Sequence, residues 1–214
     1  MKKGGFFRER IYPVLFMVIV TIVFISVISG IYLSTEELTK SNETLFIRRA
    51  VLASAGIAVP ETGAEVTALY DARVREVKDS AGAIQYYGIL GAGTAAAGSS
   101  DAVSYSVIQS GPGLWGEITA VVGFNADFSS MTGIDFIKQS ETPGLGARIT
   151  EPWFKEQFKG KMGPFELVPE GTAAKPNEMD AITGATRTSN FVQQIINDSI
   201  LRARDLVAKG GENG

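Results

Sequence analysis

A long run of apolar residues near the N-terminus dominates the hydrophobic pattern of the chain. From Ile11 to Leu33 no residue is charged, and the charge-free stretch lies between Arg10 and Glu36. At about 1.5 Å per residue, a helix of this length exceeds the roughly 30 Å hydrocarbon core of a bilayer. A secretory signal peptide is the alternative, but its apolar part is usually shorter and ends at a small-residue cleavage site, whereas this run ends in Gly-Ile-Tyr-Leu. The pattern therefore predicts a transmembrane helix over residues 11–33.

The charges on the two sides of this span differ in sign. Basic residues precede it and acidic residues follow it: Lys2, Lys3, Arg8 and Arg10 before, and Glu36, Glu37 and Glu43 after. By the positive-inside rule, residues 1–10 are predicted to be cytoplasmic. Residues 34–214 are predicted to lie outside the cytoplasmic (inner) membrane, on the periplasmic side where there is one.

The exported part shows both helical and strand patterns. Residues 34–60 are predicted to hold a connecting helix, followed by a domain over residues 61–214. The sequence predicts four short strands, of which the last two show β-branched and aromatic residues alternating with smaller or polar ones. A short helix is expected near 151–158. The strands are expected at 83–90, 102–109, 116–124 and 133–138, with a Gly/Ala/Ser loop at 91–100.

The last predicted helix has the clearest period. Its apolar face contains Val192, Ile195, Ile196, Ser199, Ile200, Ala203, Leu206 and Val207 at 3.6-residue spacing. Thr188 or Ser189 is expected to be its N-cap, and Gly210-Gly211 its end. The fold class is therefore predicted to be α+β: a small antiparallel sheet with packed helices, preceded by one transmembrane helix.

Composition limits the chemistry of this domain. The chain has 214 residues, a net charge of −3, and neither Cys nor His. Disulfides, thiolate iron–sulfur ligation, Cys/His zinc sites and Ser-His-Asp catalysis are thereby excluded. A bound cofactor must be held by backbone, hydroxyl, amide, carboxylate, Lys or Arg groups, and we assign no metal ligands and no catalytic acid or base.

Two turn segments combine glycine with apolar residues. In Gly111–Gly116, Trp115 precedes a strand, and it is either a core residue or an apolar wall for a flat ligand. In Glu141–Gly146, Pro143-Gly144 favours a type II turn with positive φ at Gly144, which lets backbone amides approach a ligand. Leu145 stands between two glycines and would be exposed unless something covers it.

A third segment, Asp180–Ser189, runs into the last helix. It places hydroxyl residues beside Gly184-Ala185 at a helix N-terminus, where free N–H groups can bind phosphate. An ordinary capping segment has the same composition, so this segment alone leaves both interpretations open.

Taken together, the three segments resemble a known family. Thr-Gly-Ala-Thr at 183–186 after Asp180, Glu-Thr-Pro-Gly-Leu-Gly at 141–146 and Gly-Leu-Trp at 113–115 resemble the FMN-binding domain found in the G subunit of the Rnf complex (RnfG) and in the C subunit of the Na⁺-translocating NADH:quinone reductase (NqrC). The resemblance extends over roughly residues 10–208. Two positions depart from the family pattern: Thr183 is often Ser, and an aliphatic residue is expected in place of Arg187.

The resemblance implies FMN bound covalently to Thr186 through a phosphoester. The residues it implies around the flavin are Thr183, Gly184, Ala185, Asp180, Glu141, Thr142, Gly144, Leu145, Leu114 and Trp115. A flavin transferase using FAD and Mg²⁺ is implied for maturation, since a threonine hydroxyl is a poor nucleophile at neutral pH.

The implied function is electron relay within an ion-translocating redox complex, together with other membrane subunits. The residues around Trp115 and after Arg187 lean toward the quinone reductase, whereas the short chain and the compact 116–140 region lean toward the Rnf type. Of the two, we favour the Rnf-type ferredoxin:NAD oxidoreductase. The alternative from another class is an anchored assembly or regulatory protein without a redox role. A hydrolytic enzyme is a third alternative, although no suitable general base is evident.

Overall fold

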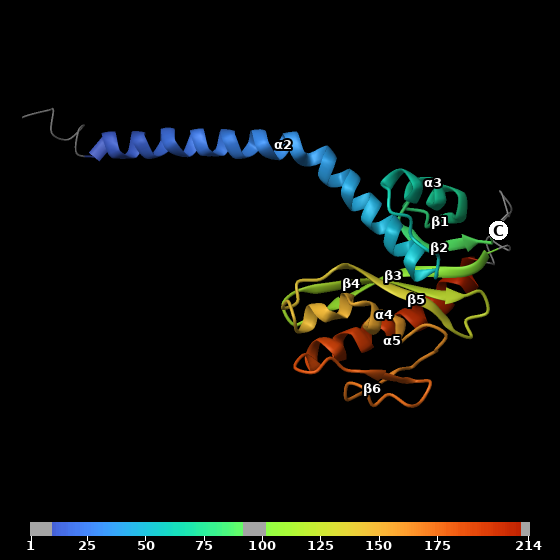
Figure 1. Cartoon of the computed structure of the whole chain (residues 1–214). Coiled ribbons are helices and arrows are strands. Elements are labelled where there is room, and N and C mark those ends of the chain that lie inside the picture. The colour runs from blue at the N-terminus through green and yellow to red at the C-terminus, as the bar shows by residue number, and fades with distance from the viewer. Residues whose placement is uncertain (1–9, 92–101, 211–214) are drawn as a thin grey trace, which may run out of the picture. The chain divides into compact units, whose positions relative to one another are not determined.

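The structure is a computed structural model, and it describes residues 10–91 and 102–210. It divides into two compact units, residues 1–44 and 45–214. Nearly all of the expected loop at 91–100 lies outside the described residues. The elements are drawn in Figure 1, and their bounds are α2 Tyr12–Ser54, α3 Gly63–Arg73, β1 Val74–Lys78, β2 Ile84–Leu90, β3 Ala102–Pro112, β4 Glu117–Asn125, β5 Met131–Lys138, η3 Gly146–Thr150, α4 Pro152–Glu156, β6 Glu166–Val168, β7 Glu178–Asp180 and α5 Thr186–Gly210.

Helix α2 contains the apolar run and continues beyond it. It is 43 residues long, and its most apolar window has a mean hydropathy of 2.9 with none of its residues buried, so it is long and apolar enough to cross a membrane. The helix is not interrupted after residue 33 but continues to Ser54. It ends in a Schellman pattern, in which the N–H of Gly56 is donated to Ala53 O and that of Ile57 to Leu52 O.

The sheet of the second unit has five antiparallel strands in the order β1-β2-β3-β4-β5. The four predicted strands are β2 to β5, and the predicted α+β class with an antiparallel sheet is confirmed. Strand β1 was not predicted, nor was helix α3, which joins it without any turn residue between Arg73 and Val74. A separate parallel pair, β6 and β7, was also not predicted because each strand has only three residues.

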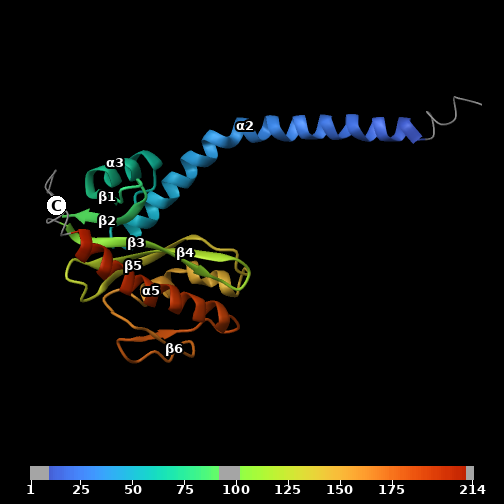
Figure 2. The same cartoon turned by 180° about the vertical axis from the view of Figure 1, so that it is seen from behind.

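Hydrophobic side chains cover both faces of the sheet, as β4 shows most clearly. Ile118, Ala120, Val122 and Phe124 belong to a core shared with α4 and α5, whereas Val121 faces the other core, shared with α3 and the end of α2. Figures 1 and 2 show α5 on one side of the sheet and α3 on the other. Every predicted apolar position of α5 through Ala203 is buried, and Leu206 and Val207 pack against the same core.

The C-terminal end of α2 lies against a pair of facing glycines, Gly123 in β4 and Gly133 in β5. Thr132 Oγ1 donates a hydrogen bond of 2.6 Å to Ser54 O, and the hydroxyls of Ser54 and Ser106 are 3.0 Å apart. A Cβ at Gly123 would collide with the backbone of Ser54 and with Thr132 Oγ1. The absence of a side chain at Gly123 therefore permits this close approach of helix to sheet.

Gly123→Ala is accordingly expected to lower the free energy of unfolding by about 1–3 kcal/mol, since backbone atoms of α2 must shift to admit the methyl group. The control is Gly88→Ala in β2, where the nearest atom to a new Cβ is 3.8 Å away and the cost should be small. Urea unfolding followed by tryptophan fluorescence measures both. Equal stability of the two variants would contradict the importance of this contact.

Candidate functional site: a cavity at the start of α5

The three glycine-containing segments, far apart in the sequence, meet at the N-terminal end of α5. They enclose a cavity of about 340 Å³ whose lining residues come from all three. That volume falls in the range of small-molecule sites. The lining residues are Leu114, Glu141, Thr142, Leu145, Gly146, Gly184, Ala185, Thr186, Arg187 and Thr188.

Glu141 connects the three segments. Its side chain is buried, and its Oε1 accepts hydrogen bonds from the N–H groups of Leu114 (2.8 Å) and Trp115 (3.2 Å). Its other oxygen, Oε2, accepts a hydrogen bond of 2.5 Å from Thr188 Oγ1 in α5. These donors come from the two segments that do not contain Glu141, so this one carboxylate holds both walls of the cavity in place.

The turn after Glu141 has the predicted form. Leu145 N donates to Thr142 O over 3.1 Å, and Gly144 has a φ of 72°. The turn leaves the Leu145 side chain 43% exposed, with its Cδ2 3.1 Å from where a Cβ on Gly184 would lie. Leu145 thus rests across the loop that leads into α5.

The hydroxyls at the start of α5 have distinct environments. Thr186, the first residue of the helix, is exposed and lines the cavity, and its hydroxyl has no hydrogen-bond partner within the described part of the chain. Thr188 is buried and bonded to Glu141, while the buried Ser189 hydroxyl accepts from Ile182 N and donates to Ala185 O.

The expected N-cap role of Thr188 or Ser189 is therefore wrong. The helix begins at Thr186, and Ser189 N donates the first helical hydrogen bond to Ala185 O. Both residues lie inside the first turn, where their hydroxyls hold neighbouring segments. The N–H groups of Thr186, Arg187 and Thr188 precede that first bond, so they have no acceptor within the helix.

Four of the residues implied by the resemblance do not line the cavity: Asp180, Thr183, Gly144 and Trp115. The Asp180 carboxylate accepts the N–H groups of Thr172 and Ala173, each over 2.9 Å. The Thr183 N–H is donated to Glu170 over 2.7 Å, and this bond is the main cause that lowers the pKa of Glu170. Asp180 and Thr183 thus support the loop before α5.

Trp115 is 69% exposed, so the interpretation of it as a core residue is wrong. Leu114, beside it, is 44% exposed. Together with Leu145 they leave apolar surface next to the cavity, whereas the polar groups lie at the start of α5. A site apolar at one end and rich in donors at the other suits a flat ring that carries a phosphate.

Three cavity residues were not expected there: Gly146, Arg187 and Thr188. Gly146 closes the second motif, and a Cβ on it would lie 2.7 Å from Thr188 Oγ1, so it allows the turn to touch α5. The pairing of Thr188 with Glu141, which are 47 positions apart, has no local sequence signal.

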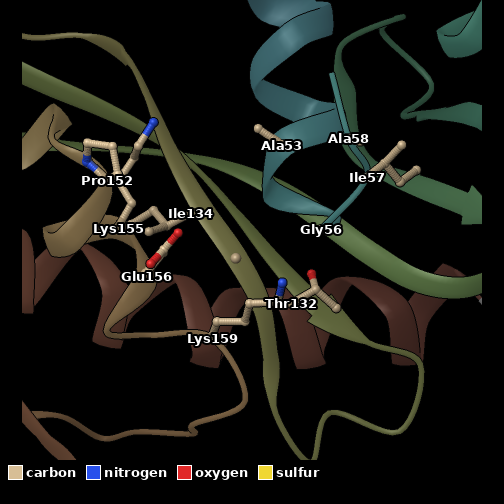
Figure 3. A pocket seen from close by; sticks show the side chains of 11 residues that line it. Ala53, Gly56, Ile57, Ala58, Thr132, Ile134, Pro152, Lys155, Glu156 and Lys159 are labelled. Atoms are coloured by element: carbon tan, nitrogen blue, oxygen red, sulfur yellow. The ribbon is translucent and has the colours of Figure 1, made fainter. Parts of the chain in front are cut away.

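A second cavity, of about 400 Å³, lies between the residues that end and follow α2 and those around α4. Figure 3 shows Ala53 and Ile57 on one side of it and Lys155, Glu156 and Lys159 on the other. None of the residues implied by the family motifs lines this cavity. Of these two cavities, only the one at α5 is lined by residues from the motifs.

Comparisons with known proteins match the region that contains the cavity at α5. Residues 113–201 match the family described as "FMN-binding domain", a stretch that includes all ten cavity residues. The G subunit of the Na⁺-translocating ferredoxin:NAD⁺ oxidoreductase complex of Acetobacterium woodii is 44% identical over 104 residues, which cover 47% of this chain and 49% of that protein.

Two further curated relatives match over stretches of the same length. The G subunit of the ion-translocating oxidoreductase complex of Methanosarcina acetivorans is 38% identical, and the match covers 48% of this chain and 52% of that protein. The C subunit of the Na⁺-translocating NADH-quinone reductase of Vibrio anguillarum is 36% identical, and the match covers 44% of this chain and 41% of that protein. The matches thus span about half the length of these relatives.

The fold is shared with two crystal structures of the quinone reductase's C subunit, NqrC. The protein from Parabacteroides distasonis superposes with a TM-score of 0.59 at 24% identity, with 78% of this chain and 94% of that chain covered. The protein from Shewanella oneidensis superposes with a TM-score of 0.63 at 20% identity, with 76% of this chain and 93% of that chain covered. Residues 113–201 of the chain are thus similar to the FMN-binding domain, and the proteins matched are G subunits of Rnf-type complexes and C subunits of Na⁺-translocating quinone reductases.

Proposed function

We infer that this chain is a membrane-anchored flavoprotein subunit that holds FMN through a phosphoester to Thr186. The observation that carries the proposal is the state of the Thr186 hydroxyl within the matched FMN-binding domain. Among the hydroxyls of 183–189, Thr186 alone lines the cavity while being exposed and without a hydrogen bond in the described residues. It is thus the hydroxyl open to modification.

The surrounding residues fit FMN. Unbonded N–H groups at the start of α5 suit a phosphate, and the exposed apolar side chains of Leu114, Trp115 and Leu145 suit the flat ring. The chain has no Cys or His, so thioether and histidyl linkages to a flavin are excluded while an ester to threonine remains available.

The attachment step follows from the chemistry of a hydroxyl and a flavin pyrophosphate. Thr186 Oγ1 forms a bond to the FMN phosphorus of FAD, the pyrophosphate bond to AMP breaks, and AMP leaves with the hydroxyl proton released to solvent. No side chain near Thr186 acts as a base in this proposal, so a separate flavin transferase with Mg²⁺ would supply the activation. The residues of this chain present the hydroxyl and position the phosphate.

When bound, FMN would supply one-electron relay within an ion-translocating complex. We favour a complex of the Rnf type, because the G subunit from Acetobacterium is 44% identical and the C subunit from Vibrio anguillarum is 36% identical over equally long stretches. Other membrane proteins of that complex would be its partners. The role of this chain is to fix the ring position through the Glu141 contacts.

The apolar helix and the relation to ion-translocating complexes indicate a membrane-anchored protein. We place residues 1–10 in the cytoplasm, the span at 11–33, and residues 34–60 and the 61–214 domain outside, on the charge asymmetry at the two ends of the span. Protease added to intact spheroplasts should digest the domain and leave a tag before Met1 protected. Protection of the domain would overturn this orientation.

Colour and denaturation test the flavin proposal against a purely structural role. Chain purified from a host with the transferase should be yellow, and the flavin should remain with the chain after denaturation in guanidinium chloride and gel filtration. A colourless, folded chain from that host would instead support an anchored assembly or regulatory protein. Flavin released on denaturation would support FMN binding but contradict the ester.

The exposed apolar residues beside the cavity should tune the flavin without holding it. Trp115→Ala is expected to leave covalent flavin in place, change the free energy of unfolding by no more than about 0.5 kcal/mol, and shift the absorbance maximum or midpoint potential. Leu145→Ala should act similarly. The control is Leu201→Ala, an exposed residue on α5 that does not line the cavity. Unchanged spectra and potentials in both variants would show that these residues do not contact the ring.

A further inference from the structure

Arg187 has an unusual electrostatic position. It is the second residue of α5, lies next to Thr186, is exposed and lines the same cavity. The N-terminus of a helix carries a partial positive charge, so a cation there is unfavourable unless an anion is near. The first turn of α5 contains no acidic residue to compensate.

Two other arginines of the second unit, residues 45–214, have carboxylate partners. Arg148 pairs with Glu151 and Glu170, each over 3.3 Å, and Arg48 pairs with Asp71 over 3.5 Å. By contrast, Arg187 has no ion pair or side-chain hydrogen bond within the described part of the chain. The carboxylate that lines the same cavity, Glu141, is buried and already bonded to three donors of its own.

The cavity thus presents an uncompensated guanidinium, a helix N-terminus and a free hydroxyl in two consecutive residues. We propose that Arg187 is a positioning residue that binds the flavin phosphate. This inference rests on the proposed FMN site. The Arg187 guanidinium donates to the phosphate oxygens and neutralises their charge, both before the ester to Thr186 forms and afterwards, when the diester retains one negative charge. Arg187 thereby makes this cavity select phosphorylated flavin.

The test compares two ligands that differ only in the phosphate, FMN and riboflavin, bound to the full-length chain in detergent. Thr186→Val is used as background so that no ester can form. FMN is expected to bind at least about tenfold tighter than riboflavin, as one charge-assisted contact allows. Adding Arg187→Leu should lower this ratio by about tenfold, with the riboflavin dissociation constant unchanged, and Arg187→Lys should fall between.

Arg204→Leu is the matched control. It removes an exposed arginine from the same helix, away from the cavity, and should leave the FMN-to-riboflavin ratio unchanged. The preference for FMN should also fall with added salt in the background variant and depend much less on salt after Arg187→Leu. No preference for FMN in the background variant, or the same preference after Arg187→Leu, would overturn the proposal.

A second readout needs no flavin. In the flavin-free chain, Arg187→Leu should raise the midpoint of thermal unfolding, because it removes a cation from the positive end of α5, while Arg204→Leu should change it little. A lower midpoint for Arg187→Leu would contradict the electrostatic argument. Neither measurement requires the ester, so neither depends on whether Thr186 carries flavin. An unmodified Thr186 in mass spectrometry would therefore count against the proposed attachment alone.

Discussion

Thr186→Val is expected to abolish covalent flavin completely. Valine keeps the β-branched shape and nearly the volume of threonine but has no oxygen to bond phosphorus. Thr186 is exposed and its hydroxyl is not bonded within the described residues, so the free energy of unfolding should change by no more than about 0.5 kcal/mol. The measurement is in-gel flavin fluorescence of denatured chain from a host that supplies the transferase.

Two neighbouring threonines are the controls for this variant. Thr183→Val should retain covalent flavin, because Thr183 lies outside the cavity. Thr188→Val should also retain it, but should cost about 1.5–3 kcal/mol, since it removes a hydrogen bond to the buried Glu141 carboxylate. Covalent flavin on the Thr186→Val chain, or its loss from the Thr183→Val chain, would show that the attachment residue is wrong.

Glu141→Ala is expected to have the largest effect on the site as a whole. It removes the carboxylate that accepts three hydrogen bonds, so the Thr188 hydroxyl and the N–H groups of Leu114 and Trp115 lose this acceptor. The free energy of unfolding should fall by about 3 kcal/mol. The walls of the cavity should also separate, so the yield of covalent flavin should drop several-fold even at temperatures where the chain is folded.

Glu141→Gln removes the negative charge of this side chain but keeps its size and shape. Its amide oxygen can still accept from Leu114 N and Trp115 N, and its NH₂ can donate to Thr188 Oγ1, so flavin yield and stability should lie between those of wild type and Glu141→Ala. Glu156→Ala, an exposed carboxylate outside this cavity, should match wild type. Normal flavin yield in folded Glu141→Ala would contradict the role given to this carboxylate.

The long-period features of the fold could be predicted from the sequence. Residues that repeat at 3.6 positions marked the buried face of α5, which packs on a core along one side. Runs of β-branched and aromatic residues marked β2 to β5, because side chains on both faces of the sheet are buried. The apolar run marked the start of α2. It could not show that the helix continues to Ser54, although no proline or glycine interrupts the residues from Ile31 to Ser54.

Helix α3 and the strand pair β6 and β7 were not predicted from the sequence, and each has a local physical reason. Helix α3 does carry a start signal, Thr62 with Glu65 three positions later, and the structure shows Glu65 N donating to Thr62 Oγ1 over 3.3 Å. It was missed because the helix passes directly into β1 without a turn residue. Strands β6 and β7 are too short for any period to register.

The site was predictable in its segments but not in the contacts between them. The motifs around Trp115, Leu145 and Thr186 each pointed to the region, and the structure brings seven of the eleven implied residues to one cavity. The bond from Thr188 to Glu141 and the position of Arg187 depend on tertiary packing. Capping preference alone misassigned Thr188, because a hydroxyl near a helix start can bond either the helix or a distant carboxylate.

Peptide mass spectrometry locates the flavin on the chain. Wild-type chain from a host with the flavin transferase, digested without reduction of the flavin, should yield the peptide containing Thr186 with the added mass of FMN less one water, and fragmentation should place that mass on Thr186. An unmodified Thr186 peptide from folded chain in that host, or FMN located on any other residue, would rule out attachment of the flavin at Thr186.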